Sequence, residues 1–293
     1  MNFLALLLGL GLERLLTRVF HLREFRWLDP VFAAVFARLA RVSPALVLPA
    51  LLVLALLLAA PVVLATLWIV TAGQGLAFLL FAVLVLLFSL GPRDLQQEVD
   101  DYCAALATGD AAALAALGRE LTERDVGADP ARRPEEVERA IYQQAGNRIF
   151  GVVFWFLLLG PAGAWAFRVV DLMRRHAMLG AATTPVQVAA RVLHGVLAWV
   201  PVRLMAGAFA LAGSFEPAAA AWRPTGDGAA TRFFERSDAL AARVGCGARG
   251  SATTEVAAGE TAALVSAIGL VRRALWLIWY PAIALLTLAD WLR

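Results

Sequence analysis

The stretch LVLPALLVLALLLAAPVVLATLWIV, Leu46–Val70, contains no charged residue. About 20 consecutive apolar residues are enough for a helix to cross the hydrocarbon core of a bilayer. This stretch therefore predicts a transmembrane helix, with a kink at Pro61. A second apolar run, LAFLLFAVLVLLFSL at Leu76–Leu90, begins after the short polar linker TAGQ at 71–74. Because so short a linker connects only adjacent helices, the two runs predict an antiparallel pair of spans at about 46–70 and 75–91.

The composition of the whole chain agrees with a membrane location. The chain has 293 residues, of which 61% are hydrophobic and 17% charged, and its mean hydropathy is +0.72. Soluble domains are about 45–50% apolar and about a quarter charged. These values exclude an ordinary soluble domain, a disordered chain and a disulfide scaffold. They predict an all-α integral membrane protein with about four transmembrane helices.

All 26 basic residues are arginine, since the chain contains no lysine. A phosphate-binding loop and pyridoxal chemistry both require a lysine, so both are excluded. The two cysteines, Cys103 and Cys246, are far apart in polar segments. We therefore expect neither a structural disulfide nor a thiol metal site.

Two further spans are predicted at the ends of the chain. Ala274–Trp291 is apolar and is flanked by interfacial aromatic residues. The N-terminal run, at about 2–19, carries Glu13 and Arg14 as adjacent intramembrane charges, which we expect to pair in part. It lacks the basic start and the small-residue cleavage site of a signal peptide, so we expect it to be retained.

Arginine counts near the span ends predict the orientation of the spans in the membrane. The loop Arg18–Ser43 has five arginines and the loop Gly91–Arg148 has seven. Loops rich in arginine remain cytoplasmic. Both termini are then expected in the periplasm.

Two apolar stretches are interrupted. Ile149–Val170 is broken by Gly160-Pro161-Ala162-Gly163, and Val186–Phe215 contains Pro201 and Arg203. We predict that each forms a membrane-embedded helical hairpin of two half-helices within the segment 149–215. A pair of ordinary crossings is an almost equally good interpretation.

The polar segments are expected to be cytoplasmic and helical. In the segment 93–148, apolar residues follow a helical period, Asp110 is a candidate N-cap, and a third helix is predicted to begin at Pro134. These helices would form a cytoplasmic cap. The segment 216–262 is expected to be a second insertion, helical over 230–244, before the final membrane segment 263–293.

Few motifs indicate catalysis. Gly245–Gly250 matches G-x-G-x-x-G, but no strand precedes it, so we expect a flexible glycine-rich loop. His21, His176 and His194 lack metal-ligand spacing, so no metal site is predicted and packed or interfacial histidines are expected. No nucleophile motif is found either.

Polar residues scattered near apolar sequence form the candidate ligand site. They are Arg124, Asp125, Asn147, Arg148, Arg168, Asp171 and Arg203. Guanidinium groups bind carboxylates and phosphates in bidentate fashion, so converging arginines would suit an anionic small molecule. Alternatively they form ion pairs, as Arg168 and Asp171 would at i and i+3 on one helix.

At these residues the chain resembles the AmpE family, membrane proteins associated with the regulation of inducible β-lactamase. The likeness covers the N-terminus to about residue 215 and a hydrophobic C-terminal span. It rests on Glu13-Arg14-Leu15-Leu16, on Asn147-Arg148 through Phe154-Trp155, on Gly160-Pro161-Ala162-Gly163 through Phe167-Arg168, and on Leu193-His194 with Trp199-Val200-Pro201-Val202-Arg203-Leu204.

The chain is more distantly similar to the CobD/CbiB adenosylcobinamide-phosphate synthases, which use ATP. Arg124-Asp125, Asn147, Arg168 and Arg203 match residues of that family's motifs. The acids of its Glu-x-x-x-Glu-Asn-x-x-Asp stretch, however, fall on Tyr142, Gly146 and Phe150. The resemblance thus implies a shared scaffold and a basic pocket whose metal ligands and acid/base groups are lost.

Two functions follow. The first is a non-catalytic regulatory modulator of the inner membrane, linked by the AmpE resemblance to β-lactamase induction and cell-wall recycling. It would need no cofactor, and its partners would be the bilayer, an anionic nucleotide or muropeptide-like ligand and a signalling protein, with no nucleic acid. The alternative is a membrane-bound transferase or ligase that uses Mg-nucleotide. Transport is a third interpretation, but it predicts inverted repeats, which the sequence lacks.

Overall fold

The computed structural model describes Leu6 and residues 26–90, 94–123, 133–180, 182–223, 236–250 and 259–291. All regular structure in these residues is helical, which confirms the predicted all-α fold. Four helical runs among them are long and apolar enough to cross a membrane: Pro44–Thr71, Glu135–Leu179, Thr184–Ala212 and Thr261–Leu285. The chain is an all-α, multi-pass membrane protein. Apart from Leu6, the predicted first span at 2–19 lies outside the described residues, and so do Glu13 and Arg14.

The chain folds into two compact units. The first unit comprises Met1–Pro92 with Asn147–Ala198, and the second comprises Arg93–Gly146 with Trp199–Arg293. Both later boundaries fall inside helical runs, because the chain remains helical through 146 and 147 and again through 198 and 199. Each unit therefore combines two separate parts of the sequence.

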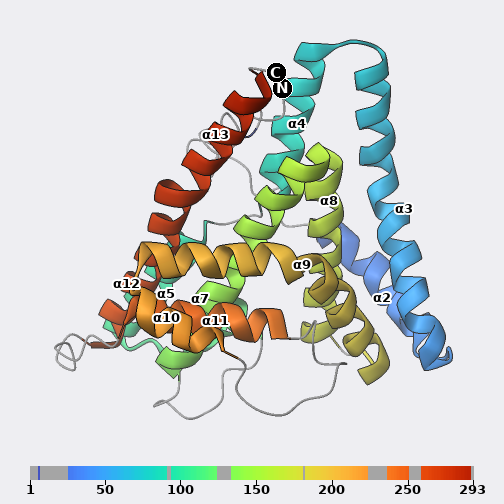
Figure 1. Cartoon of the computed structure of the whole chain (residues 1–293). Coiled ribbons are helices and arrows are strands. Elements are labelled where there is room, and N and C mark those ends of the chain that lie inside the picture. The colour runs from blue at the N-terminus through green and yellow to red at the C-terminus, as the bar shows by residue number, and fades with distance from the viewer. Residues whose placement is uncertain are drawn as a thin grey trace. The chain divides into compact units, whose positions relative to one another are not determined.

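In the first unit, α3 (Pro44–Thr71) and α4 (Gly75–Ser89) form the predicted antiparallel hairpin (Figure 1). The turn between them contains Gly73 at φ +67°, a left-handed conformation that glycine adopts without steric cost. The helix α3 continues through Pro61. With 15 residues, α4 is about 22 Å long, which is shorter than the roughly 30 Å hydrocarbon core.

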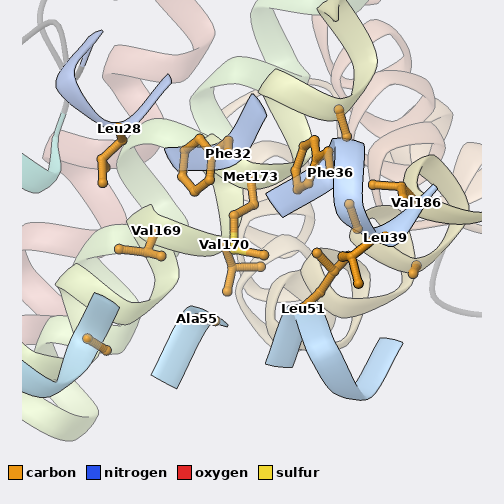
Figure 2. Packing of buried hydrophobic residues seen from close by; sticks show 14 of the residues in the cluster. Leu28, Phe32, Phe36, Leu39, Leu51, Ala55, Val169, Val170, Met173 and Val186 are labelled. Carbon is orange, nitrogen blue, oxygen red and sulfur yellow. The ribbon is translucent and has the colours of Figure 1, made fainter. Parts of the chain in front are cut away.

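One face of α3 builds the core of the first unit. Val47, Leu51, Ala55 and Ala59 recur at intervals of four residues and are buried, as a helix packed on one side requires. Together with residues of α2 (Asp29–Leu39), α8 (Gly151–Leu179) and α9 (Thr184–Ala212), they form a continuous apolar cluster (Figure 2). The opposite face of α3 exposes large apolar side chains, among them Trp68. An exposed apolar face of this kind suits contact with lipid acyl chains.

The helix α8 is folded back on itself at Gly160, which has φ +67° and ψ −154°. A Cβ added to Gly163 would lie 2.4 Å from the carbonyl oxygen of Trp155. In a straight helix eight residues span about 12 Å, so the chain must reverse between these two residues, and Figure 1 shows α8 in two limbs. This fold-back agrees with the helical hairpin predicted for Ile149–Val170, and the placement of that hairpin within the membrane stays a prediction.

The second predicted hairpin is wrong, because Val186–Ala212 lies in the single helix α9, which is not interrupted at Pro201. Proline has no N–H to donate to the carbonyl four residues earlier, which here belongs to Leu197. The indole Nε1–H of Trp155 donates to this carbonyl at 3.1 Å. A side-chain donor from α8 thus replaces the missing backbone donor, and α9 remains helical.

In the second unit, the polar segment forms the three expected helices, α5 (Leu95–Thr108), α6 (Ala111–Thr122) and α7 (Arg133–Ala145). The Asp110 carboxylate caps α6, since Oδ1 accepts hydrogen bonds from the backbone N–H groups of Ala112 and Ala113 at 3.0 Å. Glu135 and Glu136 lie in the first turn of α7, where acids interact favourably with the helix dipole. The capping pattern of the sequence is confirmed.

The remaining helices of the second unit are α10 (Phe215–Trp222), α11 (Arg236–Arg249), α12 (Gly259–Ala274), the π-helical segment η5 (Leu275–Trp279) and α13 (Tyr280–Trp291). The helix α11 overlaps the stretch predicted to be helical over 230–244. The last three elements form one continuous helical run that includes the predicted C-terminal span.

The glycine motif at 245–250 is not the predicted flexible loop, because it forms the last turns of α11. A Cβ on Gly245 would lie 2.4 Å from Cγ of Tyr142, and one on Gly247 would lie 2.8 Å from the carbonyl oxygen of Pro217. These glycines let α11 pack closely on α7 and α10. Gly250, at φ +76°, ends the helix in the left-handed conformation common at helix C-termini.

Candidate functional site

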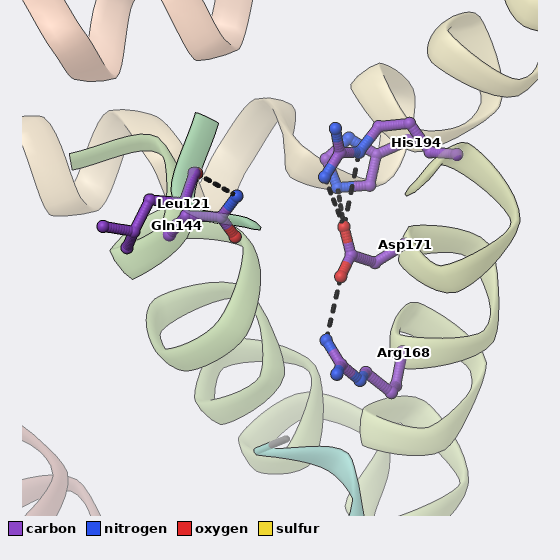
Figure 3. Close-up of polar contacts among 6 residues, drawn as sticks. Leu121, Gln144, Arg168, Asp171 and His194 are labelled. Atoms are coloured by element: carbon purple, nitrogen blue, oxygen red, sulfur yellow. Dashed lines mark hydrogen bonds and ion pairs between the residues drawn. The ribbon is translucent and has the colours of Figure 1, made fainter. Parts of the chain in front are cut away.

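A buried ion-pair cluster surrounds Asp171 in the first unit. Arg168 Nη1 donates to Asp171 Oδ2 at 2.9 Å, and Arg174 Nη2 donates to Oδ1 at 2.8 Å. His194 Nε2 lies 3.7 Å from the same Oδ1 (Figure 3). The side chains of Arg168 and Asp171 are only 1% and 3% exposed. Each carboxylate oxygen therefore accepts a hydrogen bond from a guanidinium group, and both ion pairs are shielded from bulk water.

The local fold explains why these groups meet. Arg168, Asp171 and Arg174 are spaced three residues apart on the second limb of α8, so their side chains lie on one face of the helix. His194 comes from α9, where its ring lies 5.6 Å from that of Phe167, centroid to centroid. Hydrogen bonds to charged groups are stronger than neutral ones. The cluster consequently fixes the orientation of both guanidinium groups.

Asn147 and Arg148 lie in η3 (Gly146–Phe150), a π-helical segment between α7 and α8. Short π-helical insertions are rare and frequently occur at functional sites. Both side chains are buried, and Asn147 Oδ1 has no hydrogen-bond partner within the described part of the chain. The structure thus gives this predicted pair an unusual backbone setting.

Arg203 belongs to the second unit and contacts Trp199 of the same helix, α9. Its Nη1 donates to the Trp199 carbonyl at 2.9 Å, and its guanidinium lies 4.0 Å from the centroid of the Trp199 ring. That distance is typical of a cation–π interaction. Arg124 and Asp125, the other predicted pair, lie outside the described residues.

Sequence reasoning missed Arg174 and His194 as members of the Asp171 cluster. Arg174 was detectable, because it follows Asp171 by three residues just as Asp171 follows Arg168. His194 carried no such signal, since it is 23 residues away on another helix. The interpretation of Arg168 and Asp171 as an i, i+3 ion pair is confirmed.

A second ion pair, between Glu138 and Arg249, was also missed. Arg249 Nε donates to Glu138 Oε1 at 2.7 Å and Nη2 donates to Oε2 at 3.2 Å, which joins α11 to α7 in the second unit. Tyr142 Oη donates to the same carboxylate at 3.4 Å. The neighbouring carboxylate raises the pKa of Arg249, although burial opposes it. No local pattern links residues 111 positions apart.

The three positions on which the synthase acids fall are packed. Tyr142 and Phe150 are fully buried, and the Tyr142 ring lies 5.5 Å from that of Phe209 in an edge arrangement. A Cβ on Gly146 would lie 3.3 Å from Met205 Cε. These three positions therefore contribute packing surface.

One family model matches the chain over residues 1–287, and it describes the Regulatory signalling modulator protein AmpE. The match covers essentially the whole sequence. Searches of curated proteins and of solved structures found no match.

Proposed function

Since the chain belongs to the AmpE family, we propose that it is a non-catalytic regulator of the bacterial inner membrane that links inducible β-lactamase expression to cell-wall recycling. Its ligand is an anionic small molecule, such as a nucleotide or a muropeptide, and it signals to a protein partner. The arginine-rich loops of the sequence support an orientation with both termini in the periplasm.

The observation that carries the non-catalytic part is the packing of Tyr142, Gly146 and Phe150. ATP-dependent ligases need carboxylates to hold metal-nucleotide and to move protons. Tyr142 and Phe150 are fully buried and Gly146 has no side chain. This arrangement supports a scaffold that retains the synthase architecture without its acid groups.

The candidate residues for recognition of the anionic ligand are Asn147, Arg148 and Arg168 in the first unit, Arg203 in the second unit, and Arg124, which lies outside the described residues. Asp171 supports this role because its ion pairs orient Arg168, and Arg174 shares that carboxylate. Preoriented guanidinium groups lose less entropy when they bind an oxyanion. Asp171 is thus a positioning residue for the basic site.

The test is complementation of a strain that lacks its own copy of this gene, read as β-lactamase induction. Arg203→Ala is the sharpest variant, because Arg203 is only partly buried whereas Arg148 and Arg168 are fully buried, so its loss perturbs the fold less. We expect it to reduce the induction response at unchanged membrane abundance, whereas Arg38→Ala, at an exposed arginine of α2, retains it. Full induction with Arg203→Ala would contradict the basic site, and induction that is independent of the wild-type protein would contradict regulation.

The ligase alternative is tested on the purified protein in detergent. Ligand binding to the folded state raises the apparent melting temperature by mass action. We expect a shift with muropeptides that is lost in Arg203→Ala. A shift with Mg-ATP that disappears in the same variant would instead favour the nucleotide-dependent enzyme.

A further inference from the structure

A cavity of 740 Å³ lies in the second unit between α7 and α11. Each helix contributes one face to it, at positions 136, 139, 140 and 143 of α7 and 239, 242, 243 and 246 of α11. Both sets follow the i, i+3, i+4, i+7 spacing of a single helix face. The volume falls in the range of small-molecule sites, about 300–1,000 Å³.

The charged side chains that line this cavity are Arg139, Arg243 and Glu136. Arg243 Nε is buried and has no hydrogen-bond partner within the described residues. Arg139 is 60% exposed and lies 3.7 Å from Glu135, a distance at which an exposed ion pair contributes little. Glu136 is exposed on the first turn of α7. Arg243 therefore places its guanidinium group in the half-buried part of the lining, whereas Arg139 and Glu136 lie toward solvent.

The rest of the lining is small and largely neutral. Four alanines, Ala140, Ala221, Ala239 and Ala242, leave the space open. Cys246 adds an uncharged thiol, since burial and the Glu138 carboxylate raise its pKa to about 12. Ligand sites commonly combine an apolar wall with a few polar groups, and here the alanines lie beside two arginines, a composition that suits an amphipathic anion.

We propose that this cavity binds a small molecule that carries an oxyanion, a carboxylate or a phosphate, on a compact apolar group. Arg243 and Arg139 bind the oxyanion, because guanidinium groups match its geometry with two parallel hydrogen bonds. Arg243 lines the cavity from α11 and Arg139 lines it from α7, so an oxyanion can contact a guanidinium group from each helix. The alanine wall receives the apolar group.

None of the cavity residues belongs to the basic site proposed above, so this is a separate site. Its occupancy is measured on the purified full-length protein without any signalling readout. Failure of the cavity proposal and failure of the proposed function are therefore distinguishable.

Cys246 provides a reporter inside the cavity. The chain has two cysteines, so Cys103→Ala leaves Cys246 as the single thiol. The rates at which an anionic and a cationic methanethiosulfonate modify Cys246 are measured. Each rate is divided by the rate at which the same reagent modifies 2-mercaptoethanol, and the two normalised rates are compared. We expect a normalised anion preference of about tenfold, the low end of electrostatic focusing in charged clefts.

Three variants in the Cys103→Ala background assign the preference to named arginines. In Arg243→Ala the normalised rates of the anionic and the cationic reagent should differ by no more than about twofold. Arg139→Ala should reduce the anion preference partly. Because the Arg139 side chain is mostly exposed, this variant should fold even if Arg243→Ala proves unstable. Arg272→Ala, at an exposed arginine of α12, should leave the preference unchanged. Equal normalised rates, or a preference insensitive to both lining arginines, would overturn the proposal.

Protection of Cys246 identifies the ligand chemistry. Benzoate and phenyl phosphate test the two oxyanions on the same apolar group, and benzyl alcohol is the neutral match. We expect at least one anion to slow modification by the uncharged methyl methanethiosulfonate, with no effect of benzyl alcohol. The anion that protects Cys246 more strongly identifies the preferred oxyanion, which is the carboxylate for benzoate and the phosphate for phenyl phosphate. Equal protection by the alcohol, or no protection by either anion, would contradict an oxyanion site.

Discussion

The two units place their charged side chains in different environments. In the first unit, Asp171 pairs with Arg168 and Arg174, whose side chains are 1% and 8% exposed. In the second unit, Arg249 pairs with Glu138 but is 27% exposed. Breaking a buried pair leaves a charge without solvent, whereas water compensates a partly exposed one. We therefore expect substitutions in the first unit to affect stability and those at the α7–α11 cavity to affect ligand binding.

The largest expected effect tests the first half of this comparison. Asp171→Ala removes the carboxylate that two buried guanidinium groups contact, and such a loss costs about 3–5 kcal/mol. The free energy of unfolding, measured by SDS titration in mixed micelles, should fall by that amount. The control is Asp101→Ala, at an exposed acid on α5, which should change it by less than about 0.5 kcal/mol. Similar values for both variants would show that burial does not separate the two units.

Much of the fold was predictable from local sequence. The uncharged run Leu46–Val70 indicated α3 because the bilayer sets the length of an apolar helix. Asp110 marked the start of α6 because a capping carboxylate acts on backbone N–H groups two and three residues later. Gly160-Pro161 indicated the fold-back of α8, since these residues interrupt a helix locally.

Predictions failed where a tertiary contact decided the conformation. Pro201 did not divide α9, because Trp155, 46 residues earlier in the sequence, supplies a donor to the Leu197 carbonyl. Gly245 and Gly247 looked like a loop because their packing partners, Tyr142 and Pro217, are not sequence neighbours. In the candidate site, Arg168 and Asp171 were recognisable as an ion pair because they are three residues apart on one helix. His194 was not recognisable as their neighbour because it lies on another helix.

The next prediction compares glycines of the two units. In Gly163→Ala the new methyl group meets the backbone oxygen of Trp155 at 2.4 Å, and in Gly245→Ala it meets the Tyr142 ring at the same distance. Overpacking of this kind costs about 1–3 kcal/mol. We expect Gly163→Ala to cost more, because a backbone carbonyl in a hairpin moves less readily than a ring.

These losses are measured by the same SDS titration. If Gly245→Ala proves neutral, the close approach of α11 to α7 would not be a constraint on that position.

A smaller effect is expected at the partly exposed ion pair. Arg249→Ala removes two hydrogen bonds to Glu138, and hydrogen bonds to charged groups contribute about 1.5–3 kcal/mol when buried. Because Arg249 is partly solvated, we expect a loss of about 1–2 kcal/mol. Arg272→Ala is the matched control and should lose less than about 0.5 kcal/mol. A loss as large as that of Asp171→Ala would erase the distinction between the units.

The smallest effect is a gain. Gly207 lies in α9, and a Cβ added there meets no atom within 4 Å. Glycine in a helix interior is less stable than alanine by about 0.5–1 kcal/mol, because it loses more backbone freedom on folding. Gly207→Ala should therefore raise the unfolding free energy by up to that amount, whereas Gly163→Ala lowers it. A decrease in the unfolding free energy of Gly207→Ala would show that a close neighbour, such as lipid or another protein, requires glycine at that position. The sign of the change in unfolding free energy therefore separates glycines required by internal packing from those required by an external contact.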